Sequence, residues 1–97
     1  MAEISVAHVN GRTLVRVVGE IDLASAPRLG EALELHDGPI IVDCSRLAFI
    51  DATGLGVLAK LSRDNGGVTL RNASPFLRKL VKVTQLDAAL RLDGSQP

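Results

Sequence analysis

The order of hydrophobic and polar positions along the chain predicts an antiparallel hairpin at its start. Residues 3–9 and 13–18 are rich in apolar and β-branched residues, and they flank the dipeptide Asn10-Gly11. Both turn residues accept positive φ, which a two-residue hairpin turn requires. The second segment is apolar on both faces apart from Arg16, so we expect it to be the more deeply buried strand.

Three amphipathic helices are predicted after this hairpin. The first begins near Ser25, a favourable N-cap, with Pro27 in its first turn, and it stops at Gly38-Pro39. The second covers residues 54–64 and ends at Asn65-Gly66-Gly67, and the third follows the cap Ser74-Pro75. Apolar or small residues recur on one side of each helix and should face a sheet: Leu29, Ala32 and Leu33; Leu55, Leu58, Ala59 and Ser62; Phe76, Leu77, Leu80 and Val81.

Further strands are predicted between the helices. Residues 40–44 form a short, continuous apolar run, which is typical of a central strand with a parallel neighbour. Residues 45–48 are expected to be a connection, and residues 68–70 another strand. Residues 86–92 suit either a short helix or a strand.

These elements predict an α/β fold with the order β-β-α-β-α-β-α. We expect a mixed sheet of about four strands with three to four helices mainly on one face, because 97 residues cannot cover both faces well. A chain of this length predicts a single domain over residues 1–97, with residues 93–97 as a flexible tail.

Composition narrows the function. The 11 basic and 11 acidic residues cancel, so no global field favours nucleic acid. The single cysteine, Cys44, excludes an internal disulfide and suits a buried position in a protein of a reducing compartment. No signal segment and no apolar stretch of about 18 residues is present, so we expect a cytoplasmic protein without membrane insertion.

The chain offers little for catalysis. The two histidines, His8 and His36, are far apart, and no Cys/His cluster suggests a metal site. The pair Gly54 and Gly56 lacks the third glycine of a dinucleotide fingerprint, and no phosphate-loop lysine follows it. We therefore expect no enzyme, no metal and no cofactor.

The most informative stretch is residues 49–58. It combines the end of a strand, a capping carboxylate at Asp51, a hydroxyl at Thr53 and two glycines at a helix start. Asp22 ends another predicted strand, and the carboxyl ends of neighbouring strands meet at one edge of a sheet. This edge suits an anion, a phosphate or a docking partner. The alternative is that these side chains only cap local structure.

Two blocks of sequence resemble a known family. Residues 18–27, Val-Gly-Glu-Ile-Asp-Leu-Ala-Ser-Ala-Pro, are similar to its Gly-Glu-Leu-Asp segment, and residues 49–58 to its Asp-Ser-Ser/Thr-Gly-Leu-Gly block. The family is the STAS domain, found in bacterial anti-sigma factor antagonists and in the cytoplasmic tails of sulfate transporters. The resemblance spans nearly the whole chain.

The resemblance implies partner switching. An unphosphorylated antagonist binds an anti-sigma factor, often an ATP-binding serine kinase, and so frees a sigma factor. The kinase phosphorylates a Ser or Thr in the second block, and a phosphatase restores binding. The docking surface implied for this chain consists of Asp22, Asp51, Ala52, Thr53, Gly54, Leu55 and Gly56.

The chain departs from the family pattern at one position. Ala52 stands where the usual phosphate acceptor follows the aspartate, so Thr53 is the phosphorylation candidate. The alternative is an antagonist that phosphate does not switch. Two other functions stay open: an accessory subunit that binds the ATPase of a membrane transporter complex, and a small-ligand or nucleotide site at the same helix start.

Overall fold

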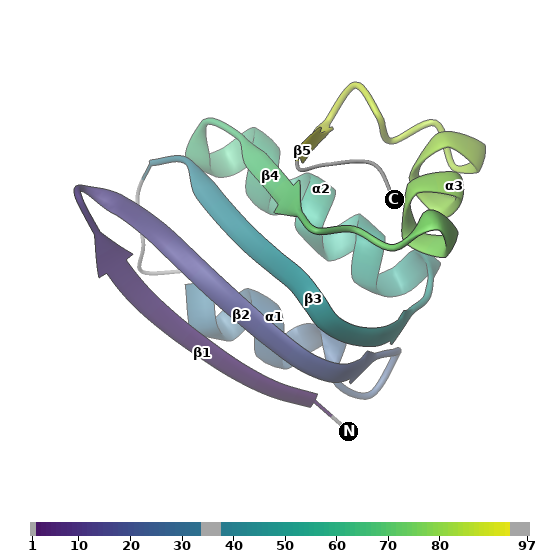
Figure 1. The fold of residues 1–97 in the computed structure, drawn as a ribbon, viewed down its shortest axis with the longest axis horizontal. Helices are drawn as coiled ribbons and strands as arrows, with labels where there is room; N and C mark the ends of the chain where they lie inside the picture. Colours follow the sequence, from purple (N-terminus) through teal and green to yellow (C-terminus); the bar gives the residue numbers. More distant parts are fainter. Residues whose placement is uncertain (1, 34–37, 94–97) are drawn as a thin grey trace.

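The computed structural model describes residues 2–33 and 38–93. One five-stranded sheet has its strands in chain order, β1 to β5, with β1 antiparallel to β2 and the other neighbours parallel (Figure 1). The elements are β1 (Ala2–Val9), β2 (Arg12–Ile21), α1 (Ala26–Leu33), β3 (Ile40–Ile50), α2 (Ala52–Asn65), β4 (Val68–Arg71), α3 (Pro75–Val83) and β5 (Leu90–Asp93). The α/β class and the mixed sheet are confirmed, with one strand more than expected.

The strand order explains why the helices gather on one side. Each parallel crossover steps to the next strand in the same direction, and right-handed crossovers then place every connecting helix on the same face. Figure 1 shows α1 and α2 behind the sheet, whose other face is open toward the viewer, and α3 beside the carboxyl end of β4. None of these described helices is long and apolar enough to cross a membrane.

The core between sheet and helices is aliphatic. Its fully buried side chains come from β2, β3, β4, β5 and both covering helices: Val15, Val17, Ile21, Leu29, Leu33, Ile40, Val42, Ile50, Leu55, Leu58, Leu70 and Leu90. Burying each one contributes about 1.5–3 kcal/mol relative to exposure. Cys44 belongs to this core as predicted; burial raises the pKa of its thiol to about 12, and the nearby Asp43 carboxylate adds to the shift.

Most local signals in the sequence are confirmed. Asn10 and Gly11 adopt positive φ of 52° and 76° in the β1–β2 turn. Gly66 ends α2 in the left-handed conformation, with φ 89°. The hydroxyl of Ser74 accepts a hydrogen bond of 3.1 Å from the amide of Leu77 at the start of α3.

Strand β3 is longer than the sequence suggested. The expected connection at residues 45–48 is part of the strand, which pairs with β2 through two register shifts, between Arg16 and Val18 and between Gly19 and Glu20. Each shift inserts an extra β3 residue and so changes which side chains face the core. The alternation of polar and apolar residues is lost there, which is why the sequence pattern favours a connection over a strand.

The C-terminal end of the predicted fold also needs correction. Residues 90–93 form β5, and Asp93 pairs with Arg71, so Asp93 is not part of a tail. The segment that adds this strand is short, and its pattern did not distinguish a helix from a strand. The tail predicted over the remaining residues, 94–97, lies outside the described residues.

The first helix differs from its prediction as well. It starts at Ala26, and the expected stop at Gly38-Pro39 follows residues 34–37, which the structure does not describe. The hydroxyl of Ser25 caps no helix amide. It accepts a hydrogen bond from the amide of Asp22, and its one proton is shared between the carbonyl oxygen of Glu20 at 3.1 Å and the carboxylate of Asp22 at 3.0 Å, so Ser25 closes the preceding loop instead.

Candidate functional site

The carboxyl ends of β2 and β3 lie side by side. Ile21 and Ile50 are paired in the parallel register, and the amide of Asp51 donates a hydrogen bond of 3.1 Å to the carbonyl oxygen of Ile21. Asp22 and Asp51, the next residue of each segment, therefore leave the sheet together. We call this region the docking edge and define it by Asp22, Leu23, Asp51, Ala52, Thr53 and Gly56.

Asp51 caps α2. Its backbone is extended (φ −100°, ψ −178°), and its carboxylate accepts a hydrogen bond of 3.0 Å from the amide of Gly54. Its carbonyl oxygen accepts the next one, at 3.1 Å, from the amide of Leu55. The first two helical amides, of Ala52 and Thr53, precede these bonds and have no intrahelical acceptor. The side chains of both residues are exposed, so the first turn of α2 combines an accessible threonine with two backbone amides that no helical carbonyl binds.

Gly54 and Leu55 have a different role from the one predicted. Gly54 is buried, and a Cβ built there would lie 2.6 Å from Cγ2 of Ile21 and 2.7 Å from Cγ1 of Ile50. Glycine at this position allows α2 to approach β2 and β3 closely. The side chain of Leu55 is 0% exposed. Both residues serve internal packing, and the buried side chain of Leu55 is not part of the exposed surface.

Gly56 remains available on the outer side of the helix. It is exposed, and a Cβ at this position would meet no atom within 4 Å. Of the predicted docking residues, the structure therefore presents Ala52, Thr53 and Gly56 at the surface, with Asp22 and Asp51 half-buried next to them.

The loop after β2 is held by the carboxylate of Asp22. It accepts hydrogen bonds from the amide of Ala24 at 3.1 Å and from the amide and hydroxyl of Ser25, both at 3.0 Å. These bonds from Ser25 keep the pKa of the Asp22 carboxyl below its ordinary value. The ordered loop leaves Leu23, which the sequence did not single out, 73% exposed.

The only two aromatic side chains of the chain are stacked on its surface. The ring centroids of Phe49 and Phe76 are 6.2 Å apart, with the ring planes inclined by 25°. They are 43% and 54% exposed. Phe76 was expected in the buried stripe of α3, and this prediction was wrong. Phe49 is the penultimate residue of β3, two residues before Asp51, so this aromatic pair lies near the docking edge.

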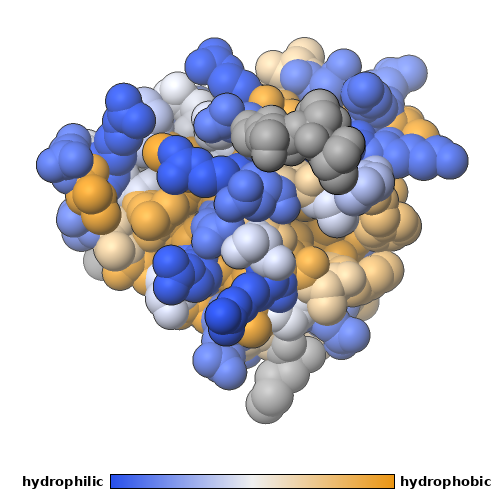
Figure 2. Space-filling model, in the orientation of Figure 1, coloured by the Kyte–Doolittle hydropathy of each residue, from blue (hydrophilic) through white to orange (hydrophobic). Residues whose placement is uncertain are grey.

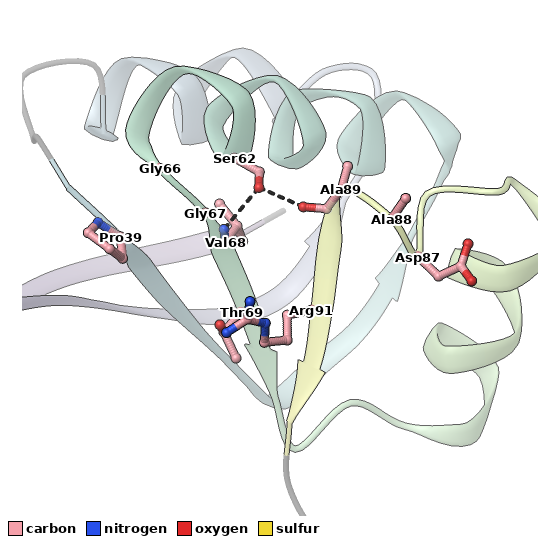
Figure 3. Close-up of a pocket in the computed structure, with 10 residues that line it drawn as sticks. All are labelled: Pro39, Ser62, Gly66, Gly67, Val68, Thr69, Asp87, Ala88, Ala89 and Arg91. Atoms are coloured by element: carbon pink, nitrogen blue, oxygen red, sulfur yellow. Dashed lines mark hydrogen bonds between the residues drawn. The ribbon is translucent and has the colours of Figure 1, made fainter.

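A separate cavity of about 440 Å³ lies where α2 ends and β4 and β5 begin. Figure 3 shows Ser62 of α2 between the two strands: its hydroxyl accepts from the amide of Val68 at 3.0 Å and donates to the carbonyl oxygen of Ala89 at 2.6 Å. These bonds fasten β4 and β5 to the helix. Over residues 2–33 and 38–93, no three His, Cys, Asp or Glu side chains are placed to hold a metal ion.

The fold is that of the STAS domain. The profile of the family described as "Mlab, STAS domain" matches residues 4–92, so the chain belongs to the STAS domain family. It is 33% identical to the anti-sigma-F factor antagonist RsfB of Mycobacterium tuberculosis over 98 aligned residues, covering 92% of this chain and 79% of that protein. It is 31% identical to the anti-sigma-B factor antagonist of Listeria monocytogenes over 84 residues, covering 78% and 74%.

A solved structure supports the same relationship. An anti-sigma factor antagonist from Mycobacterium paratuberculosis superimposes with a TM-score of 0.84 at 27% identity, covering 95% of this chain and 85% of that one. The resemblance that residues 18–27 and 49–58 predicted is therefore confirmed at the level of the family.

Proposed function

We propose that this protein is an anti-sigma factor antagonist, which binds an anti-sigma factor in the cytoplasm and thereby releases a sigma factor. The observation that carries this proposal is the docking edge of a STAS domain that is similar to two named anti-sigma factor antagonists. The similarity covers most of the length of both relatives. The protein acts by binding, and its partner would contact the surface formed by Leu23, Ala52, Thr53 and Gly56.

The shape and chemistry of the docking edge suit a protein partner. Ala52 and Gly56 project little from α2, so another backbone can approach the helix closely. Leu23 supplies an exposed aliphatic side chain beside them, and the aromatic pair adds apolar area nearby. Aromatic side chains in the centre of an interface often carry much of its binding energy. Together these features provide small, flat contacts flanked by apolar anchors.

Phosphorylation of Thr53 would reverse this binding. Ala52 has no hydroxyl, whereas Thr53 is exposed and lies in the first turn of α2. A phosphate there adds about −1.5 to −2 charge. The helix start tolerates that charge because the amides of Ala52 and Thr53 are available as donors. A partner closed over the neutral surface would instead have to accommodate a bulky dianion beside Asp22 and Asp51.

A kinase assay tests this switch. The protein is incubated with ATP and the anti-sigma kinase encoded by its source, and phosphate is located by mass spectrometry. We expect one phosphate on Thr53, none in Thr53→Ala, and faster incorporation in Ala52→Ser, which restores the usual acceptor. Phosphate at another residue, or none with a kinase that binds the protein, would contradict the switch while leaving the docking function intact.

Affinity capture tests the partner itself. Tagged wild-type protein is used as bait in extracts of the source cell, with Thr53→Glu as a matched bait that should lose the partner. We expect to recover an anti-sigma factor with the wild type only. Recovery of the ATPase of a membrane transporter in its place would show that the protein is an accessory subunit of that transporter.

A further inference from the structure

The open face of the sheet carries a cavity at the hairpin end. It has a volume of about 370 Å³ and is lined by Val9, Asn10, Arg12, Leu14, Ile41 and Arg71. We propose that this cavity is a binding site for a small amphipathic anion, with a carboxylate or phosphate head held by Arg12 and Arg71 and a short apolar tail over Leu14 and Ile41. No residue of the docking edge contributes to it.

The sheet register places the head and tail groups together. Leu14 of β2 is paired with Ile41 of β3, so two half-buried aliphatic side chains form a continuous floor. Arg12 precedes Leu14 by two residues, and Arg71 follows Thr69, the β4 partner of Ile41, by two. Side chains two residues apart on a strand face the same way. Both arginine side chains therefore rise from the open face beside the apolar floor, and both line the same cavity.

The charges around the cavity leave these two guanidinium groups without partners. Neither of them has a hydrogen bond or ion pair with another residue in the described part of the chain. Two carboxylates neighbour Arg71 across the sheet, that of Asp43 on β3 and that of Asp93 on β5. Asp43 is already engaged: Arg16 lies 3.6 Å from it, and it accepts hydrogen bonds from the amide of Ser45 and from Asn72. These groups, working against burial, hold the pKa of Asp43 below its ordinary value. Asp93 also has an interaction of its own.

The ligand class follows from these features. No acidic residue lines the cavity, and planar guanidinium groups pair well with carboxylate and phosphate oxygens. No aromatic side chain lines it, so a stacked base has no platform, whereas an alkyl chain gains from covering leucine and isoleucine. Figure 2 shows hydrophobic residues reaching the surface between charged ones on this face. The volume lies within the range of small-ligand sites, about 300–1,000 Å³.

The test uses three probes that have similar alkyl tails and differ in their head groups. Octanoate, octyl phosphate and 1-octanol are titrated into the ¹⁵N-labelled full chain and followed by amide chemical shifts. We expect saturable shifts around Leu14, Ile41 and Arg71 with one or both anions and none with the alcohol. The tighter of the two anions identifies the head group. Arg12→Gln and Arg71→Gln should each weaken binding about tenfold, as expected for loss of a charge-assisted hydrogen bond.

Arg91→Gln is the matched control. Arg91 lies on the same open face, paired with Thr69, but it does not line this cavity, so the variant should bind like the wild type. The proposal is overturned if neither anion binds saturably, if octanol binds as tightly as the anions, or if Arg91→Gln loses as much affinity as the cavity variants. Urea midpoints of all variants show whether each is folded.

Discussion

The amide of Asp51 lies 3.1 Å from the carbonyl oxygen of Ile21, and this hydrogen bond joins the two segments that build the docking edge. One segment is the cap of α2, and the other is the loop that Asp22 holds closed. Both are fixed by short internal hydrogen bonds before any partner arrives. A surface ordered in advance loses less conformational entropy on binding, which favours affinity.

The first prediction concerns the close approach of α2 to the sheet. Gly54→Ala adds a methyl group where Ile21 and Ile50 leave no room, and we expect the free energy of unfolding to fall by about 1–3 kcal/mol. Urea denaturation followed by circular dichroism measures the change.

Gly56→Ala is the control for this prediction, because it makes the same substitution two residues along the same helix. Its Cβ meets nothing within 4 Å, and alanine is the better helix former, so stability should rise by about 0.5–1 kcal/mol. Equal effects of the two substitutions would show that Gly54 does not govern the packing of α2.

The second prediction separates charge from size at Thr53. Thr53→Glu places a carboxylate at the exposed helix start, and we expect it to weaken binding of the anti-sigma factor by about 1–3 kcal/mol. Thr53→Gln introduces a side chain of nearly the same shape as glutamate but without the charge, and it should lose much less affinity. Calorimetry with the purified partner measures both. Equal losses would mean that bulk at the docking edge, rather than charge, prevents binding.

Local sequence signals predicted the turns and helix caps of the fold well. Asn10-Gly11, Asp51, Gly66 and Ser74 each act through a few neighbouring backbone atoms, so a short stretch of sequence determines what they do. The placement of the helices mainly on one face was predicted from chain length, because 97 residues cannot cover both faces of the sheet well. By contrast, the buried role of Gly54 depends on two isoleucines from different strands, and no local pattern reveals it.

The aromatic pair shows where the spacing of apolar residues gives a wrong prediction. Phe76 fits the apolar spacing of α3, yet the buried positions of that helix are Leu77 and Val81. Phe49 is exposed because the extra residues of β3 change the alternation before it. Neither bulge has a sequence signature here. The composition did carry one relevant signal. With only two aromatic residues in the chain, the core had to be built from aliphatic side chains, so neither phenylalanine was required inside it.

The third prediction assigns this aromatic pair to binding. Phe76→Ala removes one ring of an exposed stack, so it should lower stability by no more than about 1.5 kcal/mol. If the anti-sigma factor covers the pair, affinity should fall by more than about 1 kcal/mol. Val83→Ala is the control, because Val83 is an apolar residue of the same helix that is 67% exposed and lies two turns away. Unchanged affinity of Phe76→Ala would place the pair outside the interface.

The fourth prediction concerns acid and the loop that presents Leu23. The amide and hydroxyl of Ser25 bind the ionised carboxylate of Asp22 and lower its pKa in the folded protein. Because the pKa of Asp22 is lowered in the folded protein, the unfolded chain binds the proton more readily. The stabilisation by the ionised carboxylate is therefore complete above the pKa in the unfolded chain, about 3.9. It is lost as pH falls through the pKa in the folded protein. Asp22→Asn keeps an acceptor oxygen but has no charge to lose. The wild type should therefore be more stable than Asp22→Asn at pH 6, and the difference should shrink toward pH 3. Urea midpoints of both proteins across that range measure it, and a difference that stays constant with pH would show that the charge of Asp22 does not stabilise the loop.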